Sequence, residues 1–390
     1  MRFIEETWSS EKLGNLCKIT MGQSPSSKNY SKNSNDTILI QGNADLISGK
    51  IVPRIYTSEI TKLSYPGDII LTVRAPVGDL AINEFDSCIG RGVCSIKGNK
   101  FIYYYLESLK DKHVWERLSQ GSTFESVNSN DIKNLNLKIP SNSTQNHIIN
   151  FFTAIDTKIE LLQKKHGEYI RFKQYLMQNI FADKSAEKLR FDDNCQYKTK
   201  QVKDFLIESK IEGIDDINKR LTVKLNLNGI TVRESKTIEI EGATKQFIRK
   251  TGQFIYGKQN LHKGAFGIIP KELDGYLTSS DIPSFDFKGG IEPKWFYYYF
   301  ARKSFYEKLE NLSTGTGSKR ISPKEFLNIK IIVPEFKEQH KIVCLLEKFD
   351  EKINGISNQI VQMNMFKKSL LQQMFVVQLI LSLLQNKKHI

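Results

Sequence analysis

Polar and basic loops supply the side chains of this 390-residue chain that are best suited to binding a ligand. Arg, Lys, Gln, Asn and Ser side chains hydrogen-bond to phosphates and to the edges of nucleic-acid bases, and glycines beside them let the backbone approach closely. The candidate DNA-binding residues are Lys28, Lys32, Arg74, Arg91, Ser122, Thr123, Lys258, Gln259, Asn260, His262, Lys263, Thr316, Ser318, Lys319 and Arg320. Any one of these loops could be an ordinary solvated loop, but their recurrence at similar places in both halves of the chain supports the binding interpretation.

The motifs that catalysis requires are mostly missing. The stretch GQFIYGKQ (252–259) resembles a phosphate-binding loop, but its apolar residues suit a strand, and Gln259 stands where that motif has a magnesium-binding hydroxyl. Neither Gly-x-Ser-x-Gly nor His-Glu-x-x-His occurs. The six histidines are scattered, and the five cysteines form no CxxC pair. The sequence therefore predicts no catalytic residues, no metal site and no enzyme; a nucleotide hydrolase built on 252–259 is the enzymatic alternative.

The charge of the chain indicates an anionic partner. The formal net charge is +14 and the isoelectric point is about 9.3, which favours a polyanion, most simply nucleic acid. A basic protein without such a partner is the alternative. The start MRFIEETWSSEK lacks the apolar core of a signal peptide, and the apolar run at 376–384 is much shorter than the ~20 residues that cross a bilayer. We expect a soluble, cytoplasmic protein with reduced thiols and no membrane partner.

The two halves of the chain resemble each other. The runs FIYYYL (101–106) and WFYYYF (295–300) coincide at an offset of 194, and this register continues without a gap from 127 to 182. Farther upstream, SYPGDIIL (64–71) resembles RKTGQFIY (249–256) at an offset of 185. Such self-similarity indicates an internal duplication, whose front parts have diverged and whose back parts have not.

The front part of each half reads as strands joined by turns, because it is rich in β-forming residues, glycine and asparagine. The tyrosine run that follows opens an amphipathic segment, since apolar residues from Phe101 to Leu118 recur near helical spacing. We expect this segment to be a helix packed on the sheet. Its aromatic side chains could instead stack on bases, but burial in the core is the favoured interpretation.

The back part of each half reads as one long helix. Apolar residues recur at alternating steps of four and three, a heptad pattern typical of a coiled coil. Each helix spans ~40 residues, or ~60 Å at 1.5 Å per residue, and Pro140 and Pro334 stand just before the helix starts. The seam residues are Ile148, Phe152, Ile155, Ile159 and Leu162 in the first copy and Ile342, Leu346, Phe349, Ile353 and Ile356 in the second.

A helical seam needs a partner, and the other copy is the simplest one. We therefore expect an α+β fold in which two similar globular domains, each a mixed β-sheet with helices, are separated by two long antiparallel coiled-coil helices in a pseudo-twofold repeat. Lys173 and Lys367 occupy the same seam position in the two helices. We expect both side chains to extend to solvent; the alternative is that they fix the helix register or meet a partner.

The expected boundaries follow from these patterns. They are a first globular domain at 1–140, a helical spacer at 141–182, a polar linker at 183–196, a second globular domain at 197–334, a second helical spacer at 335–376 and a tail without an assigned role at 377–390.

Over residues 1–376, the chain resembles the specificity subunits of type I restriction–modification enzymes. The resemblance lies in GDIILTVRAPVG and IGRGV in the first domain, KGAFGIIPKELDGYL in the second, and the helix starts PSNSTQNHI and PEFKEQHKI, taken in order. The first helix start departs from the usual acidic pair, with Thr144-Gln145 where the second has Glu338-Gln339.

The resemblance implies that each domain is a target-recognition domain for one half of a bipartite, asymmetric site in double-stranded DNA, and that the helices set the spacer between the halves. It also implies two modification (methyltransferase) subunits that carry S-adenosylmethionine, and a restriction subunit that uses ATP and Mg. The chain itself would then need no cofactor and would be non-catalytic. A free-standing bipartite DNA-binding regulator and a coiled-coil scaffold without a DNA role are the alternatives.

Overall fold

The computed structural model describes residues 8–110, 114–119, 126–181, 189, 191, 195–234, 242, 244–312 and 320–386, without the side chains of 116, 117, 119 and 376–386. The chain forms two compact units. The first unit comprises Met1–Gln163 with Asn358–Ile390, and the second comprises Lys164–Ser357. Each unit therefore contains one globular domain and one segment of each long helix.

The globular domain of the first unit is built on mixed sheets. Within its described residues, the strand orders are β2-β12-β9-β10-β6-β5, β3-β7-β4-β11-β8 and β1-β13, with parallel pairs at β10–β6 and β11–β4. Its strands are β1 (Ser9–Lys12), β2 (Lys18–Met21), β3 (Tyr30–Ser31), β4 (Thr37–Ile40), β5 (Leu46–Ile47), β6 (Lys50–Ile51), β7 (Tyr56–Thr57), β8 (Leu63–Ser64), β9 (Ile69–Thr72), β10 (Leu80–Ile82), β11 (Ser87–Ile89), β12 (Val93–Lys97) and β13 (Asn136–Ile139). Its short helices are α1 (Leu13–Leu16), α2 (Lys100–Lys110), α3 (Val114–Ser119), α4 (Ser129–Lys133), η1 (Ser27–Asn29) and η2 (Asn43–Asp45).

The globular domain of the second unit repeats this plan with smaller sheets. Within its described residues, the orders are β15-β23-β20-β21, β16-β19-β22, β14-β24 and β17-β18. Its strands are β14 (Tyr197–Gln201), β15 (Leu206–Ser209), β16 (Glu212–Gly213), β17 (Leu221–Val223), β18 (Ile230–Val232), β19 (Gln246–Ile248), β20 (Phe254–Tyr256), β21 (Phe266–Ile268), β22 (Leu277–Ser279), β23 (Ser284–Phe287) and β24 (Lys330–Pro334). Its short helices are α6 (Pro293–Phe300), α7 (Lys303–Tyr306), α8 (Pro323–Leu327), η3 (Val202–Asp204), η4 (Ile217–Lys219), η5 (Leu261–Lys263), η6 (Lys271–Leu273) and η7 (Glu307–Leu312).

Strand register confirms the duplication that the sequence predicts. The strands β2-β12-β9-β10 and β15-β23-β20-β21 share their order and their antiparallel pairing. Ile69 of β9 pairs with Ile96, and Phe254 of β20 pairs with Phe285. The offset of 185 places Ile69 on Phe254, so the weak upstream similarity reports a true structural equivalence. Residues 254–256 are a buried strand, and the phosphate-loop interpretation of 252–259 is therefore wrong.

The tyrosine runs lie in the two cores, as expected. Helix α2 buries Tyr103, Tyr104 and Tyr105, and α6 buries Tyr298 and Tyr299. The Tyr105 hydroxyl accepts a hydrogen bond from the backbone N–H of residue 138 at 3.2 Å, and the Tyr299 hydroxyl accepts the equivalent bond from residue 332 at 3.2 Å. The two tyrosine runs therefore have the same structural role: each connects a core helix to the strand that precedes a long helix.

The two long helices are α5 (Asn142–Ile180) and α9 (Phe336–Asn386). Each begins close to a proline, Pro140 and Pro334, as predicted. The side-chain amides of Gln145 and Gln339 donate to the carbonyls of these two prolines, at 3.1 and 3.0 Å. Helix α9 extends to residue 386, ten residues past the end that the heptad pattern predicts. Within the described part of the chain, no helix combines the length and apolar character needed to cross a membrane.

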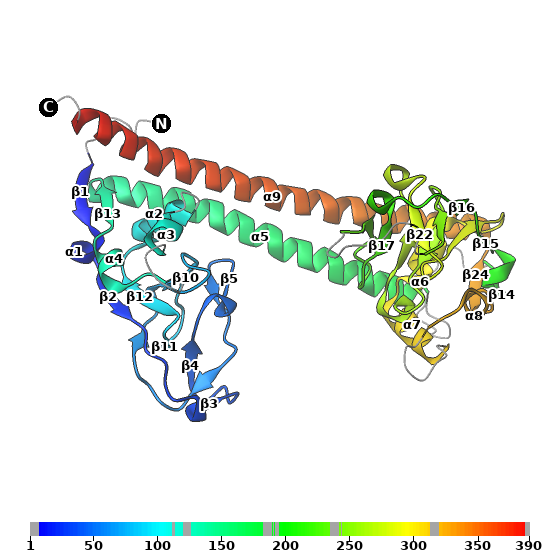
Figure 1. The fold of residues 1–390 in the computed structure, drawn as a ribbon, viewed down its shortest axis with the longest axis horizontal. Coiled ribbons are helices and arrows are strands. Elements are labelled where there is room, and N and C mark those ends of the chain that lie inside the picture. The colour runs from blue at the N-terminus through cyan, green and yellow to red at the C-terminus, as the bar shows by residue number, and fades with distance from the viewer. Residues whose placement is uncertain are drawn as a thin grey trace. The chain divides into compact units, whose positions relative to one another are not determined.

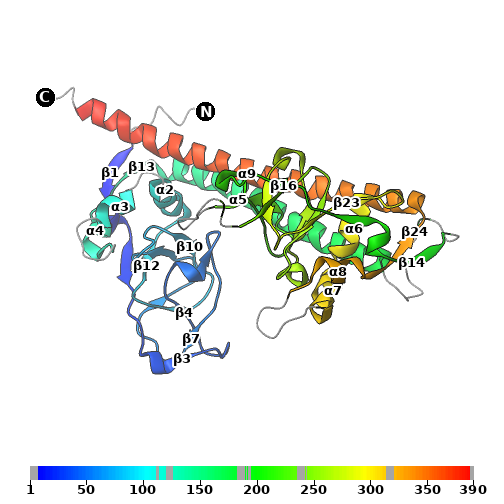
Figure 2. The same ribbon diagram turned by 45° about the vertical axis from the view of Figure 1, so that its right-hand side comes forward.

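Within each unit, the segments of α5 and α9 lie side by side and run in opposite directions (Figures 1 and 2). In the first unit the seam of α5 shares one apolar core with Leu371 and Phe375 of α9. In the second unit the Phe349 ring of α9 lies 5.5 Å from the Phe172 ring of α5. The predicted seam residues are buried or half-buried, so the heptad interpretation is confirmed within each unit.

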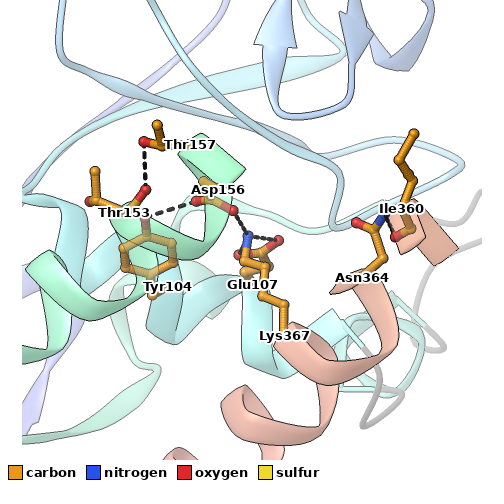
Figure 3. A network of polar contacts seen from close by, with 8 residues as sticks. All are labelled: Tyr104, Glu107, Thr153, Asp156, Thr157, Ile360, Asn364 and Lys367. Atoms are coloured by element: carbon orange, nitrogen blue, oxygen red, sulfur yellow. Dashed lines mark hydrogen bonds and ion pairs between the residues drawn. The ribbon is translucent and has the colours of Figure 1, made fainter. Parts of the chain in front are cut away.

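The expectation that the two seam lysines extend to solvent is wrong. The Lys367 side chain is 10% exposed, and its Nζ lies 2.8 Å from both Glu107 Oε2 of α2 and Asp156 Oδ1 of α5 (Figure 3). The Tyr104 hydroxyl donates to the other oxygen of Asp156 at 2.8 Å. We call Lys367, Glu107, Asp156 and Tyr104 the first lysine cluster. It connects both helices of the first unit to its globular domain.

Lys173 makes the equivalent contacts in the second unit. It forms an ion pair with Asp350 of α9, and the Tyr298 hydroxyl of α6 donates to the same carboxylate at 2.6 Å. We call Lys173, Asp350 and Tyr298 the second lysine cluster. One difference separates the two: the offset of 194 places Ala301 where the first cluster has Glu107, so Lys173 meets one carboxylate and Lys367 meets two.

The charged state of Lys367 follows from a balance of effects. Burial by itself lowers its pKa, but the charges and hydrogen bonds of Glu107 and Asp156 outweigh burial and raise the pKa above the ordinary lysine value. Burial raises the pKa of Glu107, and Lys367 opposes that rise. The lysine is therefore charged at neutral pH, and removing it would leave carboxylates without their counter-ion.

Replacement of Lys367 by methionine should destabilise the chain by about 1–3 kcal/mol, because it leaves two half-buried carboxylates without their counter-ion. Lys173→Met should cost less, because Lys173 faces a single carboxylate. Lys348→Met removes an exposed lysine of α9 and should cost little. Denaturant unfolding of the three variants measures the order; equal losses for Lys367→Met and Lys348→Met would contradict a structural role for the cluster.

Candidate nucleic-acid interface

Two of the predicted arginines lie next to each other just beyond the ends of two neighbouring strands, β9 and β12, of the main sheet in the first unit. We call this end of the sheet, and the equivalent end in the second unit, the edge. Thr72, the last residue of β9, pairs with Val93, the first residue of β12. The backbone N–H of Val73 donates to the carbonyl of Gly92 at 2.9 Å, which continues this register beyond the strands. Arg74 and Arg91 are the next residues on these two paired segments, and both side chains are exposed. The structure therefore brings together two cations that lie 17 positions apart in the sequence.

Close backbone packing holds the neighbouring loops at this edge. The backbone N–H of Arg91 donates to Ser24 Oγ at 3.1 Å, which fixes the loop after β2 beside it. A Cβ atom at Gly92 would lie 2.0 Å from the carbonyl oxygen of Gln41, so only glycine fits there. Lys28 and Lys32 lie farther along this segment, on η1 and after β3, and both are exposed.

The second unit presents the equivalent edge. The backbone N–H of Ile321 donates to the carbonyl of Lys258 at 2.9 Å, and the N–H of Val127 donates to the carbonyl of Val73 at 3.0 Å in the first unit. The offsets of 194 and 185 relate these two bonds to each other. Val127 and Ile321 therefore occupy the same place in both domains, and most of the stretches GSTFES and TGTGSKRIS lies outside the described residues.

Asp281 organises the edge in the second unit. Its carbonyl accepts from the backbone N–H of Lys258 at 2.9 Å, and its carboxylate accepts from Arg320 Nη1 at 3.0 Å. Arg320 and Lys258 are thus neighbours, although 62 positions separate them in the sequence. The ion pair is half-exposed on both sides, at 47% and 51%, so solvent screens it and a phosphate could compete for Arg320.

The remaining predicted residues of the second unit cluster around η5. Gln259 and Lys263 are exposed, and Asn260 and His262 are half-buried. The carbonyl of Asn260 accepts from the N–H of Ala265 at 3.1 Å, which closes the loop onto β21. The other predicted residues lie outside the described part of the chain: Ser122, Thr123, Thr316, Ser318 and Lys319.

A groove of about 540 Å³ opens next to this edge in the second unit. The sequence analysis identified one of its residues, Lys258, and missed the rest because they come from segments between 208 and 324. The lining residues are Glu208, Ser209, Lys210, Glu212, Lys245, Phe247, Arg249, Lys258, Ser280, Pro283, Ser322, Pro323 and Lys324. The side chains converge only when β15, β16, β19 and α8 are assembled, so no local spacing could have revealed them.

Arg249 lies beneath this groove and is 1% exposed. Its guanidinium donates to Thr278 Oγ1 at 2.6 Å, to Ser284 Oγ at 2.9 Å and to two backbone carbonyls. Burial lowers its pKa to about 10, and the charge of Glu208 opposes this shift. The residue remains charged at neutral pH, and its hydrogen bonds connect it to β15, β22, β23 and the turn between β22 and β23.

The described residues do not meet the requirements of a metal site. Among the described residues, no group of three or more His, Cys, Asp or Glu side chains could hold a metal ion. The predicted binding residues at both edges carry cations, amides and an imidazole, next to the Asp281 carboxylate, and cations and amides bind phosphates and base edges.

A family model and the curated relatives of this chain all belong to one protein family. The family model described as the type I restriction modification DNA specificity domain matches residues 5–168 and again residues 196–363. A putative type I restriction enzyme MjaX specificity subunit from Methanocaldococcus jannaschii is 36% identical over 191 residues, which are 46% of this chain and 44% of that relative. The type I restriction enzyme MjaIX specificity subunit from the same organism is 22% identical over 338 residues, 79% of this chain and 76% of the relative.

Solved structures share the fold at low sequence identity. The crystal structure of a type I restriction-modification system S subunit from M. genitalium has a TM-score of 0.58 at 15% identity and covers 96% of this chain and 98% of its own. A structure from work on complex assembly and conformational transition of the type I R-M system has a TM-score of 0.55, also at 15% identity, with 95% and 97% covered.

Proposed function

The chain belongs to the type I restriction modification DNA specificity family, as a specificity subunit with two target-recognition domains, and we propose that each domain reads one half of a bipartite, asymmetric site in double-stranded DNA. One observation carries the proposal. The equivalent edge of the main sheet carries Arg74 and Arg91 in the first domain and Lys258 and Arg320 in the second. The basic residues occupy neighbouring positions on this edge, because Lys258 corresponds to Val73 and Arg320 to Ser126. Such divergence suits two readers of different sequences.

The net charge of +14 supports a polyanionic ligand. Phosphate contacts would supply most of the affinity, and contacts with base edges would supply the discrimination between sequences. The chain itself is proposed to be non-catalytic, with S-adenosylmethionine, ATP and Mg bound by partner subunits. We place it in the cytoplasm with the DNA that it recognises.

The helices are proposed to set the spacer between the half-sites and to dock two modification subunits, with a restriction subunit joining the same complex. Phe172 of α5 and Phe366 of α9 occupy equivalent positions and are 51% and 50% exposed. Tyr175 lies beside Phe172 and is 58% exposed. Exposed aromatic residues of this kind are typical of interaction surfaces, and their repetition suits two copies of one partner.

The docking proposal predicts the outcome of co-purification. Phe172→Asp and Phe366→Asp should each reduce the amount of methyltransferase that co-purifies with the chain, and the double variant should abolish it, because a charge would be buried at the contact. Ile60→Asp places the same charge on an equally exposed residue of the first globular domain (54%) and should have no effect. Full binding by the double variant would move the docking site elsewhere; absence of any methyltransferase with the unmodified chain would favour a free-standing regulator.

The edge of the first domain predicts a salt-dependent loss of DNA binding. Arg74→Ala and Arg91→Ala should each weaken binding, and for a phosphate contact each should lower the slope of log affinity against log salt by about 1. Lys18→Ala removes an exposed lysine at the opposite end of β2 and is the matched control. Fluorescence anisotropy over a salt series measures the slopes; slopes unchanged by both arginine replacements would show that DNA lies elsewhere.

The overall proposal is tested by sequencing the methylated sites in cells that express the chain with its methyltransferase. The expected pattern is two short half-sites separated by an unread spacer of fixed length. Exchange of residues 1–140 for those of a relative should change one half-site and leave the other half-site and the spacer unchanged. A single continuous site, or a change in both halves, would contradict two independent readers.

A further inference from the structure

The groove of the second domain offers a binding surface that the loops alone do not explain. Its walls come from β15 and the residue after it, from β16, from β19, from the segment before β23 and from the start of α8. The volume of about 540 Å³ lies within the range of pockets that hold small molecules, roughly 300–1,000 Å³. The groove is therefore the right size for a segment of one nucleic-acid strand.

The walls carry an excess of positive charge. Lysines stand on opposite sides, and the pairs Lys210–Glu208 and Lys245–Glu212 balance each other. Lys258 and Lys324 also line the groove and form no ion pair with any described residue. Two lysines without an ion pair among the described residues therefore line the groove, next to the exposed Arg320–Asp281 pair.

The lining also includes an aromatic side chain that is not fully buried. Phe247 is half-exposed, and the guanidinium of Arg249 lies 5.4 Å from its ring centroid. Arg249 is held in turn by Thr278 and Ser284. The ring therefore rests against a buried, immobilised cation and lines the groove.

The first domain does not repeat this surface. The strand pairing β8–β11 corresponds to β19–β22, because Leu63 faces Cys88 as Ile248 faces Leu277. This register places Ser64 at the position of Arg249, and the bond from Val127 places Val73 at the position of Lys258. The Ser64 hydroxyl donates to the Asp68 carboxylate and accepts from the side-chain amide of Asn83, so both donors are uncharged. At the positions of Arg249 and Lys258, the described part of the first domain thus has no cation.

We propose that this groove binds one strand of the second DNA half-site, with Lys258 and Lys324 on the phosphates and Phe247 against the base edges. An apolar ring in this position selects the methyl group of thymine. Arg249 is a positioning residue that fixes Phe247 and makes no contact with DNA. The inference rests on the proposed function and adds to it Lys324 and Phe247, which the loop pattern did not identify.

The phosphate part is tested with the full-length chain and duplexes carrying the methylated site. The double variant Lys258→Ala/Lys324→Ala should lower the slope of log affinity against log salt by about 2. The control Lys271→Ala/Lys330→Ala removes two exposed lysines of the same domain that lie outside the groove. An unchanged slope in the groove variant would overturn the proposal.

The base-reading part is tested by the ratio of affinities for duplexes with a correct and a scrambled second half-site. Phe247→Ala should reduce this ratio about 10-fold, the order expected for the loss of one base contact, and should leave the ratio for the first half-site unchanged. Arg249→Lys should shift the same ratio without changing the salt slope. Phe247→Gln keeps side-chain length without the apolar ring and serves if the alanine variant does not fold.

The outcomes separate the two levels of inference. If a folded Phe247→Ala or Phe247→Gln chain keeps full discrimination at the second half-site, the groove does not read bases. If the unmodified chain shows no preference for either half-site, the proposed function itself fails, whatever the groove variants do.

Discussion

Burial of one charged lysine in each helix seam is the constraint on which the rest of the structure depends. An apolar seam tolerates many registers, because one leucine or isoleucine packs much like another. A buried ammonium group is compatible with a single register, because in any other register it would lose its carboxylates. That loss destabilises the fold by about 1–3 kcal/mol. Sliding α9 by one turn, about 5.4 Å, would take Lys367 away from both Glu107 and Asp156. The lysine clusters therefore fix how the helix segments of each unit lie against each other and against the globular domain of that unit.

The two clusters are related by the duplication but are no longer identical. Lys367 meets carboxylates from α2 and α5, whereas Lys173 meets one carboxylate from α9. Each lysine also lies near the ring of the equivalent tyrosine, at 5.3 Å for Tyr104 and 4.8 Å for Tyr298. The change of one residue, Glu107 against Ala301, accounts for the difference. A buried charge pair that differs between two copies gives each helix segment a preferred partner, which is the best-attested use of polar residues in helical seams. The duplicated chain can thus keep its two units distinct without changing the apolar pattern.

Sequence reasoning succeeded where one local pattern determines the structure. The heptads of α5 and α9, the buried tyrosine runs and the equivalence of Ile69 with Phe254 all follow from periodicity or register. It failed at Lys173 and Lys367, because heptad spacing shows that a lysine lies in a seam and not which carboxylate lies opposite. It also missed Phe247 and Lys324, because strands from distant parts of the chain create the groove. Convergent side chains of this kind are a property of topology, which spacing along the chain does not encode.

The division between shared and diverged parts has a physical reason. The residues that repeat, such as Gln145 with Gln339 and Tyr105 with Tyr299, hold the domain to its helix through hydrogen bonds that have no substitute. The residues that differ lie at exposed strand ends, where replacement costs little stability. Arg74 and Arg91 continue strands whose register is set by the buried core, so they are positioned accurately without contributing to it. A recognition edge of this kind can change its side chains while the groups that hold it in place stay the same, which is what two different half-sites on one scaffold require.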